Sequence, residues 1–171
     1  MKKILLAILA GLIIWVLWPA RIDAVSYLPP EAPGFVGKFA QNDGLLQAEV
    51  IALKDGAGPE DIAVDGEGRI YGGLHDGRII RLSADGSSQE TFTTIEGGRP
   101  LGLHFDASGN LIVADSWKGL LSVAPDGTVT TLSTEAEGTP FAFADDLDIA
   151  SDGKIYFSDA SDKYRQPDYR L

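Results

Sequence analysis

A motif that recurs three times constrains the fold of this chain more than any other feature. Its copies occupy residues 58–73, 99–115 and 143–159. The turn glycines at equivalent positions, Gly68, Gly109 and Gly153, lie 41 and then 44 residues apart. Repeats of about 40–45 residues are typical of β-propeller blades, which contain four strands each. The spacing therefore predicts an all-β protein built as a β-propeller.

Each copy contains an alternating strand, a polar turn and a second strand that is more continuously apolar. The first two copies continue through a third and a fourth strand, which are separated by Gly-containing turns. The expected strands are residues 61–64, 69–72, 78–82, 91–95, 102–105, 110–114, 120–123, 129–132, 146–149 and 154–158. No segment after residue 25 has helical periodicity. We therefore expect two complete four-stranded blades and the inner strands of a third, about two and a half blades in all.

Two and a half blades are too few to close a propeller, because a ring typically needs about four to eight blades. Residues 46–53 are expected to form an outer strand that completes the last blade of the ring. We interpret the chain as the N-terminal part of a longer propeller. A short propeller closed by oligomerisation is the alternative, and an open ring would expose a blade flank and aggregate.

The N-terminus has the pattern of a signal or an anchor. Two lysines, Lys2 and Lys3, precede an uninterrupted apolar run over residues 4–18. We expect an uncleaved signal anchor or transmembrane helix at 1–20, with the lysines cytoplasmic, and a linker at 21–44. The partial propeller, blades 1–3, then spans 45–171. Cleavage after Ala24 is the alternative, and both interpretations place the β region outside the cytoplasm, the first as a membrane-anchored domain.

Composition excludes several classes of function. The chain has no cysteine, so neither disulfides nor thiol chemistry is available. Its net charge is −11 and no basic stripe is present, which argues against a nucleic-acid partner. The acidic balance is compatible with cation binding.

Aligning the repeats brings four carboxylates to one mouth of the propeller channel, since the first strand of every blade lines that channel. They are Glu60, Asp61, Asp145 and Asp146. Clustered acids take up protons, spread into solvent or hold a cation, and oxygen-only ligands favour Ca²⁺ over zinc or copper. The alternative is that these acids accept hydrogen bonds from backbone N–H groups.

Other polar and aromatic residues have simpler interpretations. His104 lies on the first strand of the second blade and could face the channel as a general base, or it could be packed or hydrogen-bonded. His75 is expected in an exposed loop. Asp115 and Asp159 end equivalent strands and are interpreted as acceptors of backbone N–H groups. Trp117 is interpreted as an aromatic residue that packs between blades.

Five runs in the chain together resemble the strictosidine synthase-like family, which includes sequences like the adipocyte plasma membrane-associated protein. The runs are residues 58–63, 98–103, 114–120, 145–150 and 156–161. The resemblance covers the N-terminal half of such a protein. It places the chain beside gluconolactonase, regucalcin and paraoxonase, among six-bladed, calcium-dependent propellers.

The resemblance also implies roles for individual residues. Glu60 and Asp145 correspond to ligands of a catalytic Ca²⁺, although the superfamily usually has Asn where this chain has Asp145. Asp61, Asp146 and the carbonyl of Leu103 correspond to ligands of a second Ca²⁺. A further departure is Leu101, which replaces a paraoxonase histidine and puts a histidine base of that type in doubt.

Three functions remain open at this point. The first is a calcium-dependent hydrolase acting on a small-molecule lactone or aryl ester, anchored in the membrane through residues 4–18. The second is a strictosidine-type enzyme that condenses an amine with an aldehyde. The third is a propeller that binds a ligand or serves as a scaffold without catalysis.

Overall fold

The computed structural model describes residues 2–18 and 25–166. They fall into two compact units, with the division between Ala48 and Glu49. In the first unit, helix α1 (Lys2–Leu17) is followed by a short 3-10 turn, η1 (Gly37–Phe39). No helix in the described ranges combines the length and the apolarity that crossing a membrane requires. The alternative cleavage position after Ala24 lies outside the described residues.

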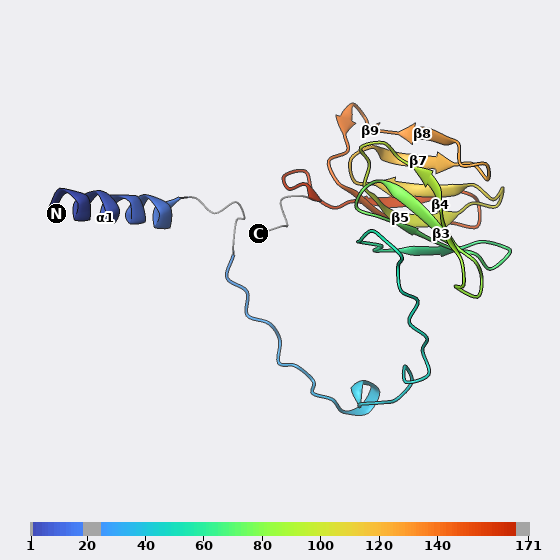
Figure 1. The fold of residues 1–171 in the computed structure, drawn as a ribbon, viewed down its shortest axis with the longest axis horizontal. Helices are drawn as coiled ribbons and strands as arrows, with labels where there is room; N and C mark the ends of the chain where they lie inside the picture. The colour runs from blue at the N-terminus through green and yellow to red at the C-terminus, as the bar shows by residue number, and fades with distance from the viewer. Residues whose placement is uncertain (1, 19–24, 167–171) are drawn as a thin grey trace. The chain divides into compact units, whose positions relative to one another are not determined.

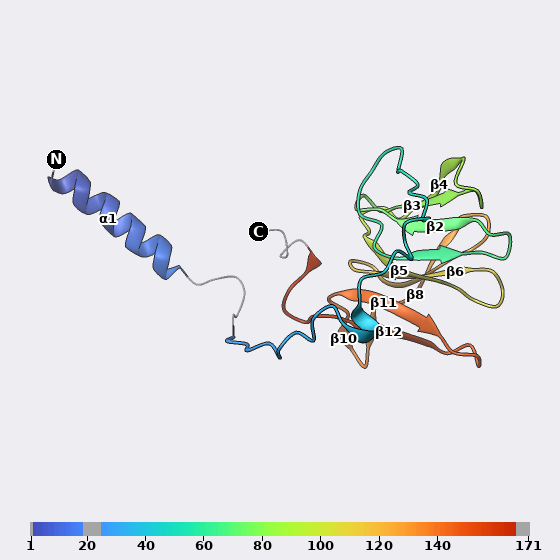
Figure 2. The same cartoon turned by 90° about the horizontal axis from the view of Figure 1, so that it is seen from below.

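The second unit consists of antiparallel sheets that follow one another along the chain (Figures 1 and 2). The first sheet contains β1 (Ile62–Val64), β2 (Ile70–Gly73), β3 (Arg78–Leu82) and β4 (Gln89–Thr94). The second contains β5 (Pro100–Phe105), β6 (Leu111–Asp115), β7 (Gly119–Val123) and β8 (Val129–Ser133). A small hairpin of β9 (Glu135–Ala136) and β10 (Thr139–Pro140) precedes a pair formed by β11 (Ala144–Ile149) and β12 (Ile155–Asp159).

The first strands of the three sheets are neighbours in space, since β5 contacts both β1 and β11. Figure 2 shows the sheets in succession, with the second between the other two. The two larger cores lie between the sheets. Strand β6 illustrates this arrangement, because Leu111 and Val113 pack in the cluster shared with the first sheet, while Ile112 and Ala114 pack in the cluster shared with β11. Its two buried faces explain why this strand is continuously apolar in sequence.

The strand predictions are confirmed within one or two residues at each end, including the two four-stranded repeats. One small hairpin was missed, and one expected strand does not form. The hairpin β9–β10 was not predicted, because its strands are only two residues long. Residues 46–53 form no strand. This segment has no partner strand in the described structure, and Leu53 instead packs against the apolar cluster of Leu74, Ile80 and Leu82.

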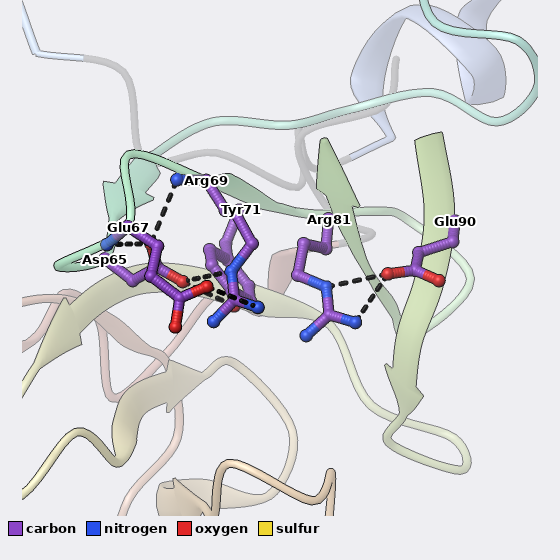
Figure 3. A network of polar contacts seen from close by, with 6 residues as sticks. All are labelled: Asp65, Glu67, Arg69, Tyr71, Arg81 and Glu90. Atoms are coloured by element: carbon purple, nitrogen blue, oxygen red, sulfur yellow. Dashed lines mark hydrogen bonds and ion pairs between the residues drawn. The ribbon is translucent and has the colours of Figure 1, made fainter. Parts of the chain in front are cut away.

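A polar network fastens the turn between β1 and β2 onto the first sheet (Figure 3). Asp65 Oδ1 accepts the backbone N–H groups of Glu67 and Arg69, both at 2.9 Å. Asp65 Oδ2 accepts the Arg69 Nε–H at 2.6 Å and the Tyr71 hydroxyl at 2.9 Å. Burial alone would raise the pKa of Asp65, but the hydrogen bonds from Arg69, Tyr71 and Glu67 outweigh it and lower that pKa to about 2.

Candidate functional site

The four acids predicted at the channel mouth do come together. Glu60 and Asp61 directly precede β1, and Asp145 and Asp146 lie at the beginning of β11. They line one pocket of about 220 Å³, together with Leu101 and Gly102 from β5. We call this pocket the acidic mouth. Each of the three sheets therefore contributes residues to it.

The acidic mouth depends on a close approach of β5 to β11. A Cβ atom added to Gly102 would lie 2.8 Å from Asp146 Cα and 2.9 Å from the carbonyl oxygen of Asp145. Atoms that close would have to move apart, and both of these neighbours are backbone atoms. The missing side chain at position 102 thus allows the acids of β11 to lie next to the second sheet.

Two of the four acids accept backbone hydrogen bonds, as the simpler interpretation expected. Asp61 Oδ1 accepts the N–H of Ile62 at 2.7 Å, and its Oδ2 accepts the N–H of Leu103 at 2.9 Å. The second contact joins the first sheet to the second. Asp146 Oδ1 accepts the N–H of Leu147 at 2.8 Å. These carboxylates therefore help to hold the strands that form the mouth.

The other two acids have different electrostatic surroundings. Burial and the neighbouring Asp146 charge raise the pKa of Asp145 above its usual value. Glu60 is more exposed, and its Oε2 lies 3.9 Å from Nη2 of Arg99. The Arg99 guanidinium is buried and donates to the carbonyl oxygen of Pro100 at 3.0 Å. A buried cation thus lies beside one acid of the mouth, whereas within residues 2–18 and 25–166 no cation contributes to the pKa shift of Asp145.

The acidic mouth fits Ca²⁺ in the type of its donors but not in their number. Carboxylate oxygens suit Ca²⁺, which takes six to eight oxygen ligands. Within residues 2–18 and 25–166, no three acidic or histidine side chains are close enough together to hold a metal ion. Glu60 and Asp145 line the same pocket and could supply two ligands, so a complete site would need oxygens from elsewhere.

His104 lies apart from the acids of the mouth. It lines a different groove, of about 400 Å³, with Ile149 and Ile155 of the third sheet. Its Nδ1 lies 3.0 Å from the carbonyl oxygen of Phe105, and its Nε2 lies 3.5 Å from Asp148 Oδ1. The structure therefore associates His104 with Asp148 across two sheets and not with Glu60 or Asp145.

The acids that end the second strands accept backbone hydrogen bonds, as predicted. Asp115 Oδ1 accepts the N–H groups of Trp117 and Lys118 at 2.9 and 3.0 Å. Burial raises the pKa of this carboxyl group. Asp159 Oδ1 accepts the N–H of Phe143 at 2.6 Å. Trp117, which we interpreted as a packing residue, is instead 49% exposed.

Arg99 is the residue of this region that sequence reasoning missed. The repeat alignment contains a signal for it, because the equivalent positions hold Gly58 and Phe143. A charged residue at a position that is otherwise small or apolar indicates a buried charge with specific partners. The carbonyl oxygens of Gly73 and Pro100 and the carboxylate of Glu60 are such partners.

Comparisons with known proteins agree on one family and one fold. Residues 37–82 match the family model described as strictosidine synthase-like, N-terminal. Protein STRICTOSIDINE SYNTHASE-LIKE 10 of Arabidopsis thaliana is 34% identical over 185 residues, covering 95% of this chain and 48% of that protein. The adipocyte plasma membrane-associated protein of Rattus norvegicus is 34% identical over 167 residues, covering 88% of this chain and 44% of that protein.

Among solved structures, a gluconolactonase from Xanthomonas campestris is similar to this chain with a TM-score of 0.56. The two are 21% identical, and the similarity covers 64% of this chain and 37% of the gluconolactonase. At that identity the similarity shows the fold alone. The chain spans less than half the length of these relatives.

Proposed function

Since this chain belongs to the strictosidine synthase-like family, we propose that it is part of a six-bladed, calcium-dependent hydrolase of lactones or aryl esters. The observation that carries the proposal is the acidic mouth, where Glu60, before β1, and Asp145, on β11, line one pocket on either side of β5. In this proposal the two carboxylates bind the same Ca²⁺, and residues outside the described structure complete its coordination.

When bound, Ca²⁺ polarises the substrate carbonyl and stabilises the negative charge that develops on its oxygen. The chain's own residues prepare the site for that cation. The raised pKa of Asp145 is what a carboxylate without a nearby positive charge acquires, and a cation would reverse it. Arg99 partly balances Glu60 in the absence of a cation. A second cation at Asp61, Asp146 and the Leu103 carbonyl stays a prediction.

The proposal leaves the catalytic base unassigned. His104 was the sequence candidate, but it lines a groove that the acids of the mouth do not share. A base for hydrolysis must reach the attacking water within hydrogen-bonding distance. We therefore assign no proton transfer to the described residues, and we propose that the base belongs to the remaining blades of the propeller.

The membrane part of the proposal rests on the N-terminus. Helix α1 is apolar on all sides after Lys2 and Lys3, and none of its residues is buried by the rest of the chain. The rat relative is named as a plasma membrane-associated protein. We propose that the apolar segment at residues 4–18 anchors the protein in a membrane, with the β region outside the cytoplasm.

Calorimetric titration of the complete polypeptide with Ca²⁺ tests the proposal. Glu60→Gln should weaken Ca²⁺ binding about ten-fold or more and reduce arylesterase activity, because it removes one of two ligating charges. Asp145→Asn keeps a ligating oxygen, so activity should persist while affinity falls. Glu135→Gln, at an exposed position of β9, is the matched control and should change neither.

The outcome that would overturn the metal-dependent hydrolase is equally specific. If the wild-type polypeptide binds no Ca²⁺, and a chelator alters neither thermal stability nor esterase activity, then the acids serve only as backbone acceptors. Activity in the condensation of an amine with an aldehyde that persists in the chelator would favour the second enzymatic function instead.

A further inference from the structure

A second cavity, of about 420 Å³, lies beside the acidic mouth. Its lining includes His75, Asp76, Gly97, Gly98, Arg99 and Trp117. We call it the Trp117 pocket. Arg99 connects the two cavities, since it lines this one while its Nη2 lies 3.9 Å from Glu60 of the other. A volume of this size is within the range of small-molecule sites, about 300–1,000 Å³.

The Trp117 pocket gathers positive charge, although the chain as a whole carries a net charge of −11. The Arg99 residue in its wall is only 4% exposed. The side chain of Lys118 lies close to Gly97 of the same lining, because its Nζ is 3.6 Å from the position that a Cβ on Gly97 would occupy. The one acid in the lining, Asp76, is already paired with Arg78 at 2.8 Å. Two carboxyl groups lie close to these cations, since Glu60 is 3.9 Å from Arg99 and Asp115 Oδ2 would lie 2.5 Å from a Cβ on Gly98. Arg99 and Lys118 are nevertheless the groups at this pocket that can attract an anionic ligand.

The aromatic wall of the pocket is held in place by a buried carboxyl group. Asp115 Oδ1 accepts the N–H groups of both Trp117 and Lys118, which fixes the turn between β6 and β7. Trp117, about half exposed, lines the pocket together with Arg99. Lys118 comes close to the same lining at Gly97. An exposed indole face next to cations offers a flat ring a stacking surface and its acid group a counter-charge.

We propose that the Trp117 pocket binds a small molecule that carries a carboxylate on a flat aromatic ring. The ring stacks on the indole of Trp117, and the carboxylate lies between the cations of Arg99 and Lys118. Neither contact requires a metal at the acidic mouth. Arg99 belongs to both sites, because it also lies 3.9 Å from Glu60. Lys118 lies at the Trp117 pocket alone, so its substitution tests this proposal without touching the acidic mouth.

Benzoate is the probe, and the fluorescence of Trp117 is the signal. The chain has three tryptophans, so Trp15→Phe and Trp18→Phe in the full chain leave Trp117 as the only indole. At constant ionic strength, benzoate should change this fluorescence saturably, with a Kd on the order of 1 mM. Benzamide lacks the charge and cyclohexanecarboxylate lacks the flat ring, and both should bind about ten-fold more weakly or not at all.

Substitutions at the pocket locate the binding site. Lys118→Gln should weaken benzoate binding about two- to five-fold, as expected for an exposed charge. Arg99→Gln should weaken it about ten-fold or more, because Arg99 is buried. Circular dichroism must show that Arg99→Gln remains folded, and Lys118→Gln keeps the test decisive if it does not. Lys154→Gln, which alters an exposed lysine of the third repeat, should leave the Kd unchanged.

Three results would overturn the proposal. The first is the absence of saturable binding up to about 50 mM benzoate, well above the expected Kd. The second is equal affinity for benzamide and benzoate, which would show that charge is not recognised. The third is either an unchanged Kd in Lys118→Gln, which would show that this lysine does not contact the ligand, or an equal loss of affinity in Lys118→Gln and Lys154→Gln, which would show a general charge effect.

Discussion

Asp65→Asn tests how the first sheet is held together. In the folded chain the carboxylate of Asp65 accepts four hydrogen bonds, two from backbone N–H groups and two from the side chains of Arg69 and Tyr71. An asparagine can accept with only one atom of its amide. Its NH₂ group would face the Arg69 and Tyr71 donors, so two donors would lose their acceptor.

The size of the effect follows from the pKa of Asp65, which falls from 3.8 to about 2 on folding. One pKa unit corresponds to about 1.4 kcal/mol. The shift would thus set an upper limit of roughly 2.5 kcal/mol, and solvent screening of a surface network reduces this to about 1–2 kcal/mol. Because the folded pKa is the lower one, this stability is fully present above about pH 4 and is lost as the pH falls toward 2.

Urea and thermal unfolding of the full chain measure this contribution. At pH 7, Asp65→Asn should lower the free energy of unfolding by about 1–2 kcal/mol, or Tm by roughly 3–10 °C. The wild-type chain should lose more stability than the variant between pH 4 and pH 2. Asp106→Asn is the matched control, because Asp106 occupies the same turn position in the second repeat but bonds to Ser108 and Asn110, with no cation.

The comparison between the two variants decides the question. A loss at Asp65 that exceeds the loss at Asp106 by about 1 kcal/mol assigns the difference to the charged Arg69 contact. Equal losses at pH 7, together with the same acid dependence in Asp65→Asn and in the wild type, would refute the reasoning. The network in Figure 3 would then stabilise the turn through its backbone hydrogen bonds alone.

Two further predictions concern the mouth and the N-terminus. Gly102→Ala should destabilise the chain by about 2–4 kcal/mol in urea unfolding, because the added Cβ would lie 2.8 Å from Asp146 Cα. Gly109→Ala is the control, because a Cβ there would have no neighbour within 4 Å. It should cost about 1–2 kcal/mol through the φ of +82° alone. A reporter fused after Leu171 should be extracytoplasmic and sediment with membranes, and recovery of a soluble form that begins at Val25 would indicate a cleaved signal instead.

Much of the fold could be predicted because each repeat carries its own turn residues. Gly68, Gly109 and Gly153 adopt φ values of 78°, 82° and 83°, so the same turn position precedes the second strand of every sheet. The convergence of the four acids followed from this register. The partners of single side chains could not be predicted, because Arg99 and Glu60 meet through packing between sheets that the sequence does not specify. The strand predicted at residues 46–53 does not form, because an alternating pattern becomes a strand only beside a partner strand.

The acidic mouth links cation binding to the packing of the sheets. Its acids belong to the first and the third sheet, and the contact from Asp61 to the Leu103 N–H reaches the second sheet between them. An unfolded chain would not hold Glu60 and Asp145 together, so a cation at the mouth would bind the packed sheets in preference. A ligand at 100 times its Kd stabilises the folded state by about 2.7 kcal/mol. Ca²⁺ bound as proposed should therefore raise Tm in the wild type and raise it less in Glu60→Gln, whereas acids that serve only as backbone acceptors would give no such difference.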